Sequence, residues 1–237
     1  MKTKITSPHK KKNSSEEFFN IENHPLMEPS TTINTKPKNI FMKKMKWWSC
    51  ITIIVLSLAI IPAFFLPLWD IYLDAPQYPE GLHMQIWTNH FSGDLPIING
   101  LNHYIGMKQI HEEMFPELQY INTVLLIILL SGVLVGLLRF RALFAGWYFG
   151  FLAVAAYGIY DFWKWEYDYG HNLNPHAAIQ IPGMSYQPPL IFGKQLLNFY
   201  AWSFPASGGL IVMSAGTVAF LLFVYEIFLR KKIHRLK

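Results

Sequence analysis

Cysteine is almost absent from this chain of 237 residues, because Cys50 is the only one. A single cysteine forms no disulfide within the chain and no zinc site built on several thiolates. The sequence also lacks a phosphate-binding glycine loop, a nucleophile-elbow serine, an HExxH helix and a CxxCH haem-attachment motif. These absences count against the enzyme classes that carry such motifs, and the sequence favours a protein that is not an enzyme.

Charged residues and histidines are missing from the middle of four long apolar stretches, at residues 47–69, 118–138, 142–160 and 207–229. Each stretch is near the ~20 residues that a helix needs to cross ~30 Å of hydrocarbon. Ion and proton transporters generally need ionisable groups at mid-membrane, so their absence argues against that class. We expect an all-α membrane protein in the lipid bilayer, with four transmembrane helices, two ordered extracytoplasmic loops and a disordered N-terminal tail.

Small residues and prolines refine the picture of the helices. Gly132 with Gly136, and Gly146 with Gly150, place glycines one turn apart, which predicts close helix contacts and leaves a homo-oligomer open. Pro62 predicts that the first helix kinks or ends early.

The distribution of charge orients the chain. Of the 20 lysines and arginines, 17 lie in residues 1–46, in the short link that holds Arg139 and Arg141, or in residues 230–237. By the positive-inside rule we expect these parts to be cytoplasmic and residues 70–117 and 161–206 to be extracytoplasmic loops. The outer loops hold 3 basic and 10 acidic residues, a net charge of −7. The overall charge of +5 therefore reflects topology and not nucleic-acid binding.

Histidine and methionine are concentrated in the outer loops, which hold six of the nine histidines and four of the nine methionines. Thioether sulfur is a good ligand for cuprous copper, and imidazole binds both of its common oxidation states. In a helix, His103, Met107 and His111 would share one face, although Gly106 weakens the helix prediction. A hydrogen-bonded structural role stays the alternative for each histidine. We predict a copper site with His103 and Met107 as primary ligands, and with His111, His83, Met84 and Met184 as further candidates.

Four strings in and near the outer loops carry a family resemblance: APQYPEGL (75–82), NGLNHYIGM (99–107), PGMSYQPP (182–189) and GKQLLNF (193–199). They resemble a poorly characterised family of bacterial polytopic membrane proteins that are encoded near nitrous oxide reductase and its copper-delivery accessory proteins. The resemblance covers roughly residues 65 to 229 and not the lysine-rich tail. It implies a bacterial inner membrane protein with an accessory role in maturing or supporting a periplasmic copper enzyme of denitrification, such as nitrous oxide reductase. Together with the ligand chemistry above, it leads us to expect a protein that binds or hands over copper on the extracytoplasmic face, with a periplasmic copper enzyme or copper chaperone as partner.

Two other functions stay open. The outer loops, rich in proline, tyrosine and tryptophan, would suit a metal-free docking platform for a periplasmic protein, or a subunit of a redox complex. A membrane oxidoreductase that uses haem or a quinone is the second alternative. Met213 is the only histidine or methionine inside a stretch, so the helices offer little to hold a haem.

Overall fold

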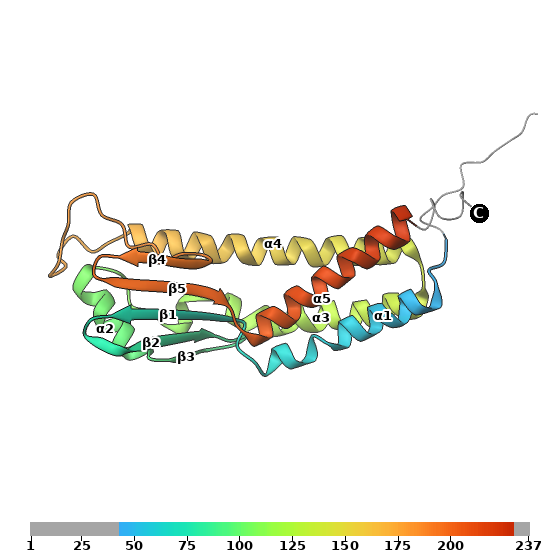
Figure 1. The fold of residues 1–237 in the computed structure, drawn as a ribbon, viewed down its shortest axis with the longest axis horizontal. Helices are drawn as coiled ribbons and strands as arrows, with labels where there is room; N and C mark the ends of the chain where they lie inside the picture. The colour runs from blue at the N-terminus through green and yellow to red at the C-terminus, as the bar shows by residue number, and fades with distance from the viewer. Residues whose placement is uncertain (1–42, 230–237) are drawn as a thin grey trace, which may run out of the picture. The chain divides into compact units, whose positions relative to one another are not determined.

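The structure is a computed structural model that describes residues 43–229. The predicted tail up to residue 42 and the basic end from residue 230 lie outside the described residues. Figure 1 shows the order of elements, which is α1 (Trp47–Leu58), the short helix η2 (Ile61–Phe64), β1 (Trp69–Ala75), β2 (Tyr78–Ile86), β3 (Phe91–Gly93), α2 (Leu95–Ile105), η3 (Glu112–Met114), α3 (Glu117–Leu138), α4 (Arg141–His171), β4 (Phe192–Leu196), β5 (Phe199–Pro205), α5 (Ser207–Val224) and the π-helical turn η4 (Tyr225–Leu229).

The all-α prediction is wrong, because the two outer loops form a five-stranded antiparallel sheet in the order β3-β2-β1-β5-β4. Burial alternates along β1, where Ile71 and Ala75 are buried and Asp74, between them, is exposed. This period of two is the strand signal. The loops were predicted separately, whereas the sheet needs both, since β1 pairs with β5 from Trp69↔Pro205 to Asp74↔Tyr200.

The prediction of four apolar helices is confirmed. Four helices, Trp47–Phe64, Glu117–Leu138, Arg141–His171 and Ser207–Leu229, are long and apolar enough to cross a membrane. As predicted, the first α-helix ends early, at Leu58, and Pro62 lies in the short helix that follows.

Helix α4 is longer than predicted. Its 31 residues extend ~46 Å at 1.5 Å per residue, which exceeds the ~30 Å of a bilayer core. Residues 141–160 suffice to cross the membrane. Residues 161–171 carry four charged side chains, and Figure 1 shows this end of α4 running beside the sheet.

Two hydrophobic cores stabilise the fold, and α4 contributes to both. Its inner half places Phe144 and Phe151 in the helical core, which also contains Ile53 and Leu222. Its outer half places Tyr169 in the core of the outer domain, under the sheet and α2. We use "outer domain" for the sheet, α2, η3, the segments between them and residues 161–171 of α4.

The two predicted glycine contacts have different outcomes. A Cβ atom on Gly132 would lie 2.1 Å from Ser57 Oγ, and one on Gly136 would lie 3.0 Å from the Cys50 carbonyl oxygen, so α1 and α3 approach closely as predicted. A Cβ atom on Gly146 or Gly150 would meet no described atom within 4 Å. The face of α4 that carries these two glycines is therefore not covered by another described helix of the chain.

Candidate functional site

Two of the predicted methionine ligands, Met84 of β2 and Met107 just after α2, lie in the core of the outer domain. Met84 is 3% exposed and Met107 is 8% exposed. Met84 points inward because it pairs with Ile71 on the buried face of the sheet. Helix α2 ends at Ile105, and Gly106 caps it with a φ of 83°. His103, Met107 and His111 therefore do not share one helix face.

The remaining candidates, His83, His103, His111 and Met184, have exposed side chains. The His83 ring lies 4.6 Å from the Tyr72 ring, and His111 Nε2 lies 3.2 Å from Gln109 Oε1. Within residues 43–229 no group of three or more His, Cys, Asp or Glu side chains comes together that could hold a metal ion. The structure thus places two candidates in one core and four on the surface.

The string NGLNHYIGM has a structural role in this fold. Asn99 binds the backbone of Ile110 twice, accepting from its N–H at 2.7 Å and donating to its carbonyl at 3.0 Å. One turn later, Asn102 Nδ2 donates to the Tyr169 hydroxyl at 2.8 Å, and this hydroxyl donates to the Lys108 carbonyl. The two asparagines attach the segment after α2 to the helix itself and to α4.

Sequence reasoning missed Glu166, which is fully buried in α4. Neither of its carboxylate oxygens has a hydrogen-bond partner among the described residues. Burial raises the pKa of Glu166 to about 8, against the opposing effect of Lys194. A signal existed, because Glu166 lies among Phe162, Trp165 and Tyr169, which pack at helical spacing into the core.

The sheet has a second face that the helices leave open. We call it the open face and define it by the side chains that alternate with the buried ones. In register Tyr72 stands between His83 and Trp202, and Asp70 stands beside Phe204. Its residues are Asp70, Tyr72, Asp74, His83, Tyr200, Trp202 and Phe204.

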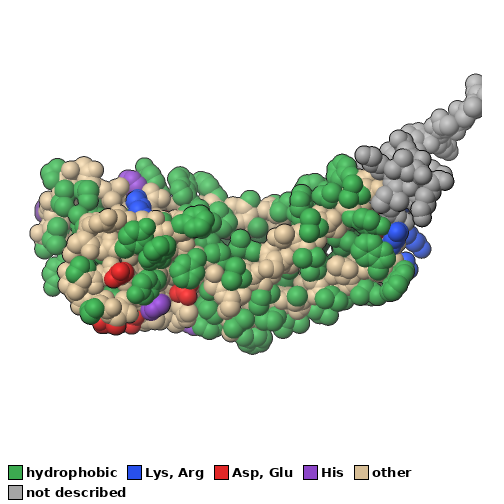
Figure 2. Space-filling model, in the orientation of Figure 1, with side chains coloured by type: hydrophobic (Ala, Val, Ile, Leu, Met, Phe, Trp, Pro, Cys, Tyr) green, Lys and Arg blue, Asp and Glu red, His purple; other side chains and the backbone are tan. Residues whose placement is uncertain are grey.

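The open face is aromatic and acidic. Trp202 and Phe204 are each 43% exposed. The Tyr200 and Trp202 rings lie 4.8 Å apart. The Tyr72 ring packs over Gly81, where a Cβ atom would lie 2.1 Å from the hydroxyl. Figure 2 shows hydrophobic side chains over the strands, with acidic and histidine side chains around them.

A buried ion pair joins three helices at the opposite, inner end of the bundle. Arg141 Nη2 lies 2.9 Å from Glu226 Oε2, with the two side chains 4% and 0% exposed. Ser49 Oγ donates to Glu226 Oε1 at 2.6 Å. We call Ser49, Arg141 and Glu226 the inner clasp. It joins α1 to α4 and to the π-helical turn after α5, which is a structural role.

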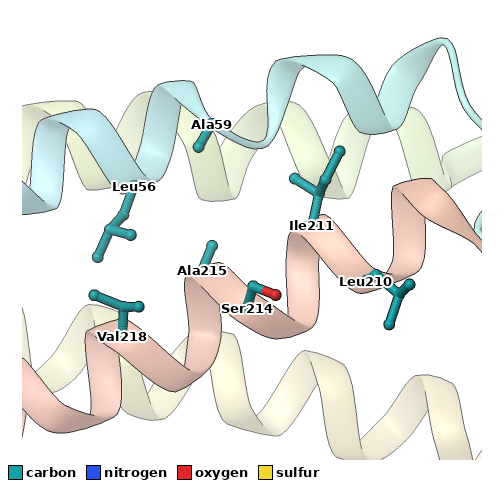
Figure 3. Close-up of a pocket in the computed structure, with 7 residues that line it drawn as sticks. All are labelled: Leu56, Ala59, Leu210, Ile211, Ser214, Ala215 and Val218. Carbon is teal, nitrogen blue, oxygen red and sulfur yellow. The ribbon is translucent and has the colours of Figure 1, made fainter.

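An apolar groove of about 320 Å³ lies between α1 and α5 (Figure 3). Ser214 is the one polar residue in its lining, so the groove offers no set of converging polar groups for chemistry. Its other lining residues are Leu56, Ala59, Leu210, Ile211, Ala215 and Val218.

The described part of the chain therefore offers a surface and not a catalytic cleft as its best-developed feature. The exposed Trp202 and Phe204 rings and the exposed Asp74 carboxylate lie on strands, which fix their positions better than loops would. Comparison with protein-family models, with curated proteins and with solved structures finds no match to this chain.

Proposed function

We propose that this protein is a membrane-anchored docking platform, which presents the open face of its outer domain to a basic protein on the extracytoplasmic side. The observation that carries this proposal is the row of Tyr72, Trp202 and Phe204 beside Asp70 and Asp74. Aromatic residues are enriched in protein–protein interfaces, where they supply most of the binding energy. The acidic residues would add attraction at a distance.

The acidic excess of the outer domain favours a basic protein as its partner. The two segments that build the outer domain hold 10 acidic and 3 basic residues. One of the basic residues, Lys108, is paired with Asp168 at 3.1 Å, which leaves the acidic excess largely unbalanced. A field of one sign speeds association with a partner of the opposite sign, and this effect weakens as salt rises.

Binding of a small basic protein to the full-length chain in nanodiscs tests the proposal. The probes are a basic and an acidic globular protein of similar size, measured by biolayer interferometry at low and high salt. We expect the basic probe alone to bind, more weakly at high salt. Trp202→Ala with Phe204→Ala should weaken its binding by at least about tenfold, since a hot-spot residue is worth about 2 kcal/mol or more.

A matched control is Ile179→Ala with Ile181→Ala, which changes two exposed apolar residues away from the sheet. Equal binding of the two probes, or equal loss in both double variants, would contradict the proposal.

Copper binding by the exposed side chains stays a separate prediction. Imidazole and thioether groups at the surface are accessible to a cuprous ion, and ligand exchange with a partner would need such access. We expect His103→Ala with His111→Ala to lower the copper retained by the purified protein, while Met107 in the core is left intact. Equal copper in the native and variant proteins, measured after incubation with cuprous ion under reductant, would count against these ligands.

A further inference from the structure

Helix α4 carries an unbroken exposed seam. Counting along it, residues spaced alternately by three and four positions are all exposed. This spacing has a mean period of 3.5 residues, the period that brings two helices together in a left-handed coiled coil. We call these residues the α4 seam: Gly146, Phe149, Ala153, Ala156, Tyr160, Trp163 and Tyr167.

The rest of the chain leaves most of this part of α4 uncovered. All nine residues from Leu152 to Tyr160 are exposed, whichever side of the helix they occupy. The contacts of α4 with α5 lie nearer its inner end, where the Phe223 ring lies 5.3 Å from the Tyr148 ring and 5.5 Å from the Phe149 ring, and Phe151 lies against Gly216. Tyr157 interacts with Tyr120 of α3, so the room for a neighbour lies on the sides of α4 that face away from α3 and α5.

The composition of the bare part favours a helix over lipid as that neighbour. Ala153, Ala155, Ala156 and Gly158 are small, and small residues mark helix–helix contacts in membranes because they let backbones approach. Gly132 shows the same rule within this chain, since it lies against α1. Lipid would also leave Trp163 and Tyr167 of this helix uncovered, because they lie beyond residues 141–160, which suffice to cross the membrane.

The exposed area is large enough to matter. The four aromatic side chains of the seam are 42–58% exposed. Since burying an aromatic side chain removes ~150–250 Å² from solvent, these four have roughly 300–500 Å² left to bury. A specific interface buries ~800 Å² on each partner. The four rings alone supply about half of that, before the small residues and the flanking Tyr157 are counted.

We propose that the α4 seam packs in parallel against the α4 seam of a second copy of this chain. Two copies enter a membrane in the same orientation, so their α4 helices are parallel and a two-fold axis brings each seam residue to its equivalent. The partner helix must cross the membrane and continue beyond it, as the 31 residues of α4 do. The resulting dimer places two outer domains side by side, which goes beyond the docking of another protein.

Single cysteines test the pairing in the full-length protein. In a Cys50→Ser background, Ala156→Cys puts a thiol in the seam, and Ala155→Cys puts one on another side of the same helix at the same depth. Both positions are exposed alanines. In nanodiscs treated with a short bis-maleimide, we expect Ala156→Cys to be captured as a dimer of twice 27.5 kDa. Ala155→Cys should give several-fold less.

Mass photometry of the unmodified protein provides a second readout, which does not depend on a substitution. We expect a dimer, and Ala153→Trp with Ala156→Trp should shift it toward the monomer because the bulky rings separate the backbones. Equal cross-linking of the two cysteine variants would overturn the proposal. A monomeric native protein that gives no cross-link would do the same, and it would leave lipid or a helix of another protein as the neighbour of α4.

Discussion

Glu166 shows how one side chain makes the stability of the outer domain depend on pH. Its pKa rises from an ordinary value of 4.5 to about 8 because it is buried, with no hydrogen-bond partner in residues 43–229. Between these two pH values the native protein keeps the proton that the unfolded chain releases. The native protein then binds more protons than the unfolded chain, so stability falls as pH rises, by up to about 1.4 kcal/mol per pH unit from about 4.5 to about 8.

Replacing the Glu166 carboxyl group should remove this dependence of stability on pH. We expect Glu166→Gln to melt at a higher temperature than the native protein at pH 8, and to differ less from it at pH 5. Differential scanning fluorimetry in detergent measures both. Glu113→Gln is the control, because Glu113 is exposed. A native and a Glu166→Gln protein with parallel pH profiles would show that Glu166 is paired or hydrated in solution.

Residues in the site differ in how far the sequence predicts them. The capacity of histidine and methionine to bind copper follows from their side chains, but which of them are buried cannot be predicted from composition. Met84 and Met107 became core residues because one faces inward on a strand and the other follows a helix cap. The burial of Glu166 could have been predicted, since a carboxylate among apolar residues at helical spacing indicates an unusual environment.

At the scale of elements, the starts of the four helices were each predicted to within one residue, whereas the strands were not predicted. Helix α3 begins one residue before its predicted start and ends at the predicted Leu138. Apolar runs are local signals, and each helix satisfies its own backbone hydrogen bonds. The strands depend on partners far along the chain, such as the pairing of Ile71 with both Met84 and Ser203. No local pattern specifies which strand will be the neighbour of which.

The inner clasp should contribute strongly to stability, because it joins α1, α4 and the turn after α5 through a buried ion pair. Arg141→Ala would remove the buried ion pair between Arg141 and Glu226, and losing one member of such a pair costs about 3–5 kcal/mol. Thermal unfolding in detergent should show a lower melting temperature. Lys108→Ala removes an exposed pair with Asp168 and should change little, since such pairs are worth about 0–1 kcal/mol. Equal losses in the two variants would refute a special role for the clasp.

The contact between α1 and α3 gives a second test at this scale. Gly132→Leu forces a side chain against Ser57, and overpacking of this kind costs about 1–3 kcal/mol. Gly150→Leu is the matched change on α4, where the structure leaves room. We expect the first variant to melt at a lower temperature and the second to melt close to the native protein. The reverse order would mean that the two helices are packed differently.

For the whole molecule, the four apolar helices follow from hydropathy, whereas the outer domain does not. The outer domain is visible only after β1, β2 and β3 from one loop meet β4 and β5 from the other. Charge bias still predicts which side it occupies. In intact cells, with Cys50 replaced by Ser, an impermeant maleimide should label Gln109→Cys and spare Phe140→Cys, and both positions are exposed. Labelling of Phe140→Cys alone would invert the proposed topology.

The central position of β1 and β5 in the sheet has a mechanical consequence. The chain leaves α1 through η2 into β1, and β5 leads into α5, so the two helices are joined at one end by the six residue pairs between β1 and β5. Their other ends meet at Ser49 and Glu226. Together these parts make a closed frame, in which neither helix can swing away from the other without breaking a strand ladder or exposing a buried carboxylate. A load applied to the sheet is therefore carried along both helices to the inner clasp.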